Sequence, residues 1–181
     1  AGHALPFTPR KGPETGRMNI VAIDIGNTKI AVGLFLDGQE QFIRSVPGEE
    51  EEPLRTLLKD AWAQVPVAKP PKEGRHDGTI VLSSVKPVWT RLVQQIAEQD
   101  LGEKVKVLGK DVPLPMPVWT DEPAKVGTDR VVSAAAAYAV VENAVVVADF
   151  GTAVTIDLVD AHGVFQGGDH HRILHHGIGR G

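Results

Sequence analysis

The sequence contains the same short unit twice: an apolar strand pattern, an Asp-x-Gly turn and a second apolar strand pattern. The first strand and turn cover residues 21–26, and the second cover residues 146–151. Each copy closes on a further glycine at the same offset, Gly38 in the first copy and Gly163 in the second. Two apolar runs around a tight turn predict a hairpin. The matched copies therefore predict a duplicated hairpin, one in each of two lobes that face each other across a cleft.

The residues of these turns suit the binding of phosphate groups. A glycine in a tight turn lets backbone N–H groups approach phosphate oxygens without a Cβ between them. Asn27, Thr28 and Thr152 can donate hydrogen bonds to such oxygens. Asp24 and Asp149 can hold a cation or its water shell. An ordinary hairpin would use Asp and Gly for the turn alone, but two matched copies favour a nucleotide site. No Gly-x-x-x-x-Gly-Lys-[Ser/Thr] sequence is present, which excludes a Walker-type loop.

Apolar periodicity predicts strands that alternate with helices. The expected strands cover residues 19–24, 29–36, 41–46, 79–83, 105–108, 144–149 and 155–159, and the expected helices cover residues 54–62, 89–99 and 131–141. This alternation indicates an α/β fold. The consecutive strands near the N-terminus indicate an antiparallel portion in the same fold.

Composition limits the classes of function. A hydrophobic fraction of 42% among 181 residues supports a packed core. The net charge is −4 and no basic block occurs, so a nucleic-acid partner has no electrostatic support. The chain has no cysteine, which excludes disulfides, cysteine-based zinc sites and thiol catalysis. No apolar run approaches the roughly 20 residues of a transmembrane helix, so no membrane partner is expected.

The segment at residues 122–130 leads directly into the expected helix at residues 131–141. Asp129 and Arg130 are therefore expected near a helix N-terminus, where the helix dipole and free N–H groups attract anions. The spacing alone favours Asp129 as a helix cap. The alternative is that Asp129 is a base that accepts a hydroxyl proton. Arg130 would then bind an anionic group of the substrate or the transferred phosphoryl group.

These elements together, in this order, resemble the type III pantothenate kinases. The resemblance runs from about residue 18 to residue 168. It is carried by Asp24-x-Gly26-Asn27-Thr28, Leu82-Ser83-Ser84-Val85-x-Pro87, Gly127-x-Asp129-Arg130, Asp149-Phe150-Gly151-Thr152-Ala153-x-Thr155-x-Asp157 and Gly163-x-x-x-Gly167-Gly168. One Asp-x-Gly-Asn-Thr motif alone is weak, but the ordered set is specific.

The resemblance implies an α/β fold of the actin-like (ribonuclease H-like) type with two domains. It implies ATP-dependent phosphorylation of the primary hydroxyl of pantothenate, which is the first step of coenzyme A biosynthesis. It also implies a cytoplasmic homodimer that needs Mg²⁺ and a monovalent cation, K⁺ or NH₄⁺. The alternatives are a non-catalytic nucleotide-binding relative, an inactive fragment of the kinase, and a sugar or acetate kinase of the same superfamily.

The resemblance also implies roles for individual residues. Contacts to ATP are expected from Asp24, Ile25, Gly26, Asn27, Thr28, Lys29, Ile30, Ala31 and Thr152. Contacts to pantothenate are expected from Gly127, Thr128, Asp129 and Arg130. Asp129 is expected to accept the proton, and Asp149 is expected to hold the monovalent cation. The family usually has an aromatic residue near the position of Thr120, where this chain has Trp119 beside it.

The expected division of the chain is a disordered leader at residues 1–17, an actin-like domain at residues 18–142, and the start of a second, incomplete domain at residues 143–181. The family pattern stops after Gly168, where a His-rich tail begins. This tail is expected to lack any strand or helix. A truncation or a change of reading frame is the favoured explanation of the tail, and a metal site formed by its histidines is the alternative.

Overall fold

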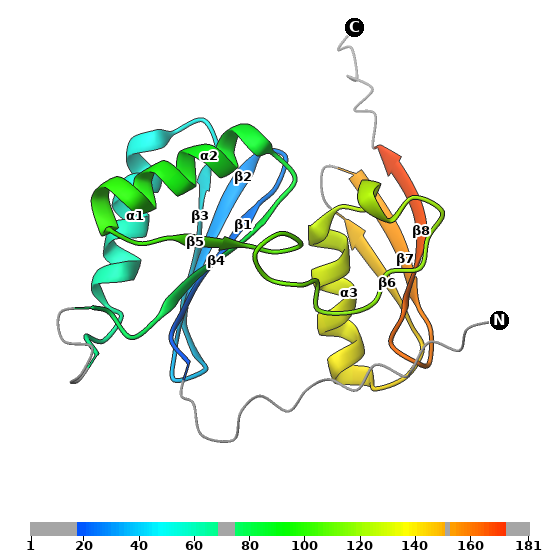
Figure 1. The fold of residues 1–181 in the computed structure, drawn as a ribbon. Coiled ribbons are helices and arrows are strands. Elements are labelled where there is room, and N and C mark those ends of the chain that lie inside the picture. Colours follow the sequence, from blue (N-terminus) through cyan, green and yellow to red (C-terminus); the bar gives the residue numbers. More distant parts are fainter. Residues whose placement is uncertain (1–17, 69–74, 151–152, 173–181) are drawn as a thin grey trace, which may run out of the picture. The chain divides into compact units, whose positions relative to one another are not determined.

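The computed structural model describes residues 18–68, 75–150 and 153–172. Contacts divide the chain into two compact units, the first ending at Pro113 and the second beginning at Leu114. This division differs from the expected boundary between residues 142 and 143. The reason is that the helix before this boundary packs on the strands after it. Each unit is described by itself (Figure 1).

The first unit contains a five-stranded mixed sheet. Its strands are β1 (Ile20–Ile25), β2 (Lys29–Leu36), β3 (Gln39–Pro47), β4 (Thr79–Ser84) and β5 (Val105–Val107), in the order β3-β2-β1-β4-β5. β2 runs antiparallel to β1 and to β3, whereas β1, β4 and β5 are parallel. The carboxyl ends of β1, β4 and β5 therefore lie at one edge of the sheet, where β2 begins. In open α/β sheets this edge is the usual place for a ligand.

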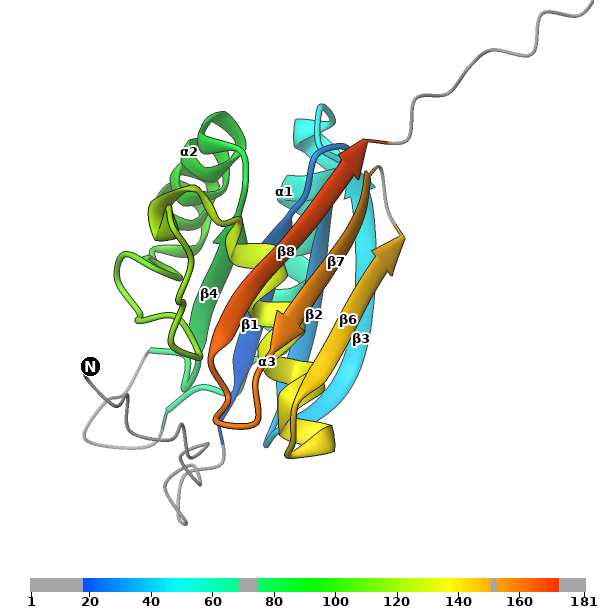
Figure 2. The same cartoon turned by 90° about the vertical axis from the view of Figure 1, so that its right-hand side faces the viewer.

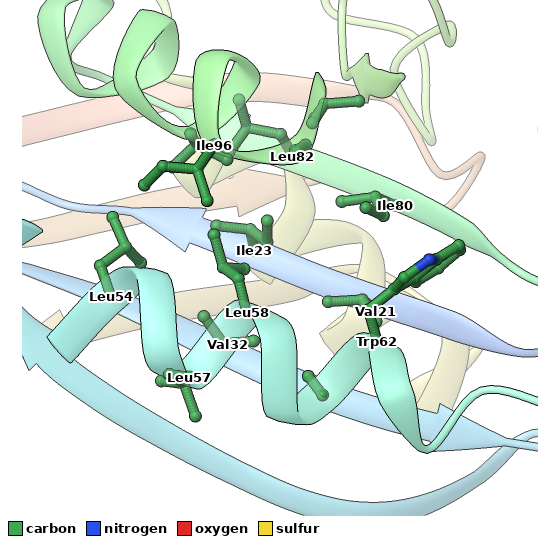
Figure 3. Close-up of a cluster of buried hydrophobic side chains, with 14 of the residues drawn as sticks. Val21, Ile23, Val32, Leu54, Leu57, Leu58, Trp62, Ile80, Leu82 and Ile96 are labelled. Atoms are coloured by element: carbon green, nitrogen blue, oxygen red, sulfur yellow. The ribbon is translucent and has the colours of Figure 1, made fainter. Parts of the chain in front are cut away.

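Two helices pack on one face of this sheet, α1 (Glu51–Ala63) and α2 (Pro87–Ile96). The buried residues of α1 include Leu54, Leu58 and Trp62, which recur every fourth position and so share one face. They meet alternate residues of β1 in the core that Figure 3 shows. α2 begins at Pro87, earlier than the expected residue 89, because proline is well suited to the first turn of a helix. A π-helical stretch, Ala97–Leu101, follows α2.

The second unit contains a three-stranded antiparallel sheet and one α-helix. Its strands are β6 (Val145–Phe150), β7 (Ala153–Val159) and β8 (Phe165–Arg172), in that order, and its helices are the 3₁₀ helix η2 (Pro123–Lys125) and α3 (Thr128–Val141). Figure 2 shows the three strands side by side. Val131, Ala134 and Tyr138 of α3 pack against Val159 and Phe165 of the sheet. This core explains why α3 belongs to the second unit.

The other face of this sheet is apolar and exposed. Val146, Phe150, Ile156 and Leu158 are all exposed, and the register places Val146 opposite Leu158. These residues alternate with the inward-pointing ones, as the pleat of a strand requires.

The duplicated hairpin is confirmed as two antiparallel pairs, β1 with β2 and β6 with β7. Gly38 and Gly163 have φ values of 76° and 73°, so the closing glycine has the same left-handed conformation in both copies. Asp24 pairs with Ala31, which follows it by seven positions (31 − 24), and Asp149 pairs with Thr155, which follows it by six (155 − 149). The connection between the paired strands is therefore one residue shorter in the second hairpin.

The expectation that no strand or helix follows Gly168 is wrong. β8 continues to Arg172, which pairs with Ala153 of β7. The sequence Asp169-His170-His171-Arg172 has no apolar alternation that would predict a strand. Its strand conformation comes from backbone hydrogen bonding with β7. Such backbone pairing cannot be recognised from the pattern of side chains.

Candidate functional site

The β1–β2 turn lies at the ligand-facing edge of the first sheet. Gly26 N donates a hydrogen bond to Lys29 O at 3.1 Å, which closes the turn. Asn27, Thr28 and Lys29 are exposed, and so is Asp24 at the end of β1. The structure therefore presents these polar side chains of the expected ATP-binding set to solvent at one place.

Three residues of the expected ATP-binding set have a different environment. Ile25 and Ile30 are both 0% exposed and belong to the core of the first unit. They can contact a nucleotide only through their backbones. Ala31 is half-buried on β2, opposite Asp24. The side chains of Ile25 and Ile30 thus fix the two strands, and the turn between them carries the polar groups.

Packing within the chain does not require the glycine at position 26. A Cβ built on Gly26 would meet only Lys29 O, at an ordinary contact distance of 3.5 Å. The turn therefore has an open backbone where a side chain would fit. An open backbone of this kind is what close approach of a phosphate needs.

The end of β4 lies beside this turn. Ser83 pairs with Asp24 in the parallel register of β4 and β1, and Val85 N donates to Ile25 O at 3.1 Å. Ser84 Oγ accepts hydrogen bonds from Lys86 N at 3.0 Å and from Thr90 Oγ1 at 2.7 Å. The Ser-Ser motif was recognised in the sequence without a role, and the structure shows that it links β4 to α2 at the edge that carries the turn.

In the second unit, Asp129 lies in the first turn of α3. Its interpretation as the helix cap is wrong, because Gly127 is the N-cap residue and Thr128 begins the helix. Asp129 is half-buried, and its Oδ1 accepts a hydrogen bond from Arg130 N at 2.9 Å. A carboxylate in this position is favoured by the helix dipole.

Arg130 is held by Asp157 of β7. Arg130 Nε lies 3.1 Å and 3.0 Å from the two carboxylate oxygens, and Arg130 Nη2 also contacts Asp157 Oδ1. Nη2 donates further to Gly168 O at 3.4 Å. The hydrogen bonds that Arg130 donates to Asp157 raise the pKa of the guanidinium, so Arg130 stays charged. Asp157 is 2% exposed and fixes the direction in which Arg130 can act.

Sequence reasoning assigned no role to Asp157, although it stands in the quoted motif. The available signal was its place on a strand: Thr155, Asp157 and Val159 alternate, so a charged residue would point to the side of an apolar one. A charge at a core position needs a partner. In the folded chain, Arg130 is that partner.

The remaining expected site residues are less fully described. Asp149 is exposed on β6, opposite Thr155. Thr152 lies outside the described residues, as do the histidines of the tail after residue 172. Among residues 18–68, 75–150 and 153–172, no group of three or more His, Cys, Asp or Glu side chains is placed to hold a metal ion.

The segment where the family usually has an aromatic residue pairs with β8. Trp119 N donates to Phe165 O at 2.8 Å, and Phe165 N donates to Pro117 O at 2.9 Å. The Trp119 side chain is exposed, while Thr120 Oγ1 is buried and has no hydrogen-bond partner among the described residues. The aromatic ring is thus present one position earlier and points to solvent.

Comparison with known proteins identifies the family. The sequence profile of a family described as type III pantothenate kinase matches residues 20–169. The chain belongs to the type III pantothenate kinase family. A protein named type III pantothenate kinase from Syntrophus aciditrophicus is 30% identical over 153 residues, and one from Anaeromyxobacter sp. (strain K) is 33% identical over 155 residues. Each alignment covers 82% of this chain and 58% of the relative.

The chain therefore spans somewhat more than half the length of these members of the type III pantothenate kinase family. Among solved structures, it is similar to the ethanolamine utilization protein EutJ from Carboxydothermus hydrogenoformans, with a TM-score of 0.48 and 13% identity over 93% of this chain and 54% of that one. It is also similar to a Bacteroides thetaiotaomicron protein with an actin-like ATPase fold and unknown function, with a TM-score of 0.39 and 14% identity over 56% of this chain and 36% of that one.

The predicted α/β fold class is confirmed by the mixed sheet and helices of the first unit and by the sheet and α3 of the second. The described part of this family member contains no helix that is both long and apolar enough to cross a membrane.

Proposed function

We propose that this chain is the nucleotide- and pantothenate-binding part of a kinase that transfers a phosphoryl group from ATP to the primary hydroxyl of pantothenate. This reaction is the first step of coenzyme A biosynthesis. The observation that carries the proposal is the family match over residues 20–169, which includes both Asp-x-Gly turns and the segment from Gly127 to Arg130. The name of these relatives, type III pantothenate kinase, supplies the acceptor, pantothenate.

The first unit is assigned to ATP. Phosphoryl transfer depends mainly on positioning and on neutralising the charge of the phosphates. The open backbone at Gly26 and the exposed Asn27, Thr28 and Lys29 supply donors for phosphate oxygens. We assign residues 24–31 and Thr152 to ATP, with Ile25 and Ile30 acting through their backbones.

The second unit is assigned to pantothenate. Gly127, Thr128, Asp129 and Arg130 form the start of α3. Asp129 is the proposed acceptor of the hydroxyl proton, since it is half-buried at the positive end of a helix. Arg130, oriented by Asp157, is proposed to bind an anionic group of pantothenate or the transferred phosphoryl group.

Cations complete the proposal. Asp149 and Thr155 are paired across β6 and β7 and offer the oxygen ligands that hard cations prefer, so they fit a K⁺ or NH₄⁺ ion. Mg²⁺ is proposed to bind with the phosphates of ATP, because Mg²⁺ commonly takes most of its ligands from phosphate and water. The bound cations would neutralise phosphate charge. We further propose a cytoplasmic location and a homodimer for the whole enzyme.

The first prediction concerns Asp129. Release of ADP that depends on both ATP and pantothenate tests the reaction, and Asp129→Asn should lower its rate by about 10²–10⁴-fold with little change in ATP affinity. Asp121→Asn, an exposed acid of the same unit, is the control and should leave the rate unchanged. A near-normal rate for Asp129→Asn would remove Asp129 from the role of base.

A second candidate is a nucleotide-binding protein without kinase activity, including an inactive fragment of the kinase. The alignment covers 58% of the relative, so the activity of this span is tested by itself. Calorimetric binding of ATP without pantothenate-dependent release of ADP would support this candidate. Release of ADP with a sugar or acetate, and not with pantothenate, would instead indicate another kinase of the superfamily.

A further inference from the structure

The corner between β3 and α1 lies against the indole ring of Trp89. Gly48 is buried at this corner, and a Cβ built on it would lie 2.0 Å from the ring of Trp89. No side chain fits at that distance, so the ring packs directly on the backbone of Gly48. Trp89 itself lies in the first turn of α2. Gly48 and Trp89 are therefore a matched pair that joins two segments far apart in the sequence.

The same corner is hydrogen-bonded to the nucleotide turn. Gly48 N donates to Thr28 O at 3.1 Å, and Thr28 belongs to the β1–β2 turn. Pro47, the residue before Gly48, pairs with Lys29 at the start of β2. Gly48 thus contacts both the ring of Trp89 and the backbone of the turn.

Trp89 has a second contact that limits the movement of its ring. Lys86 Nζ lies 3.8 Å from the centroid of the Trp89 ring, a distance typical of a cation–π contact. Lys86 N is held by Ser84 Oγ at 3.0 Å, at the end of β4. The ring is also packed against the core of the first unit. These contacts tie Trp89 to the end of β4 and to the core of the first unit.

We propose that Trp89 is a positioning residue for nucleotide binding. Its ring holds Gly48, Gly48 holds the carbonyl of Thr28, and the β1–β2 turn is thereby preset for the phosphates. The inference rests on the proposed function, since it takes this turn as the phosphate site. A preset turn loses less conformational entropy when the nucleotide binds, so the affinity for the nucleotide is higher.

The test uses the full chain and compares Trp89→Ala, Trp89→Phe and the matched control Leu92→Ala. Leu92 lies on the same helix and packs against the same core. We expect Trp89→Ala to weaken the binding of Mg²⁺-ADP about tenfold in titration calorimetry, because small misplacements of binding groups are costly. Trp89→Phe should retain most of the affinity, because it keeps a ring on Gly48. Leu92→Ala should lower the melting temperature and leave the affinity unchanged.

Hydrogen exchange provides a readout that does not need the nucleotide. The amide of Gly48 donates to Thr28 O, so its exchange should be faster in Trp89→Ala and unchanged in Leu92→Ala. Gly48→Ala is a second variant for the case in which Trp89→Ala does not fold. It keeps the tryptophan but displaces its ring, and it should weaken Mg²⁺-ADP as Trp89→Ala does.

The outcomes separate this inference from the proposed function. If the unchanged chain binds Mg²⁺-ADP and Trp89→Ala binds it equally well, the role of Trp89 is overturned and the proposed function stands. Equal losses in Trp89→Ala and Leu92→Ala would also overturn it, because general destabilisation would then explain both. If the unchanged chain does not bind Mg²⁺-ADP, the proposed nucleotide site fails, and the role of Trp89 fails with it.

Discussion

Arg130 and Asp157 form a charge pair in which the carboxylate is almost fully buried. The guanidinium side chain is 21% exposed and the carboxylate side chain is 3% exposed. Burial of a charge is costly unless a partner with good geometry compensates it. Each residue of the pair therefore depends on the other, and the proposed substrate contact of Arg130 depends on Asp157.

The second prediction follows from this pair. Arg130→Ala should destabilise the second unit by about 3 kcal/mol, because it leaves a buried carboxylate unpaired. The double variant Arg130→Met, Asp157→Leu should recover most of this loss without restoring activity. Urea unfolding followed by circular dichroism measures the change.

The control for this prediction is Lys125→Ala. Lys125 pairs with Glu122 at 2.7 Å, but both side chains are largely exposed. Loss of such a pair should cost less than about 1 kcal/mol. Similar losses in Lys125→Ala and Arg130→Ala would contradict the importance that we give to burial of the Asp157 carboxylate.

The β7–β8 turn is organised by one carboxylate. Asp160 Oδ1 accepts hydrogen bonds from His162 N at 2.8 Å and from Val164 N at 3.0 Å, and Gln166 Nε2 donates to Oδ2 at 2.7 Å. Burial alone would raise the pKa of the Asp160 carboxyl, but the hydrogen bonds from Val164, His162 and Gln166 together hold that pKa below its ordinary value. The turn is thus stabilised by the charged form.

The third prediction is a pH dependence of the second unit. Because the pKa of Asp160 is lower in the folded state than its ordinary value of 3.8, its stabilising effect is complete above that pH. The effect is lost as the pH falls through the lower, folded value. Asp160→Ala should cost about 2 kcal/mol at neutral pH, since it removes hydrogen bonds to a charged acceptor. The difference from the unchanged chain should shrink in strong acid.

Asp160→Asn is the companion variant, because an amide oxygen can still accept the backbone hydrogen bonds without the charge. It should flatten the acid limb of the urea midpoint plotted against pH. An acid limb identical to that of the unchanged chain would show that Asp160 does not contribute to it.

Elements that the sequence predicted well are those whose side chains alternate or recur with a clear period. β1 and α1 each bury one regular face, and their cores follow from that pattern. β8 was not among the expected strands, and its last residues, Asp169–Arg172, are polar and are held by backbone pairing with β7. Propensity contains no information about a partner strand.

The candidate site shows the same division. The turn residues Gly26 to Lys29 were predictable because a tight turn has a local signature. The contacts of Arg130 with Asp157 and of Gly48 with Trp89 join segments that only the tertiary fold brings together. From a single sequence the residues can be listed, but which of them contact each other cannot be predicted.

At the scale of the whole chain, the two units have separate cores of different size. The first core includes buried residues of β1, β2, α1, β4, α2, the π-helical stretch and β5, whereas the second is formed by α3, one face of a three-stranded sheet and Met116. The outer face of the second sheet exposes Phe150 at 77% and Val146 at 62%. In the described part of the chain, the second core therefore contains fewer buried apolar residues than the first.

The fourth prediction is that the second unit unfolds at a lower temperature than the first. Leu58→Ala should lower the midpoint temperature of the upper transition only, and Phe165→Ala that of the lower transition only. Each variant should reduce the free energy of unfolding of its own unit by about 3 kcal/mol. Differential scanning calorimetry measures both transitions, and the two variants identify the unit to which each transition belongs. A single transition that both variants shift equally would show that the two cores unfold as one.

Gly168 sets a limit on how this chain can vary. A Cβ at this position would lie 1.7 Å from Ile156 O and 3.0 Å from Asp157 Cα, so β7 and β8 leave no room for any side chain. The carbonyl oxygen of Gly168 also accepts a hydrogen bond from Arg130 Nη2. In a library of random codons at this position, selection for a folded chain should return glycine alone, while the exposed Val146 should tolerate many polar replacements.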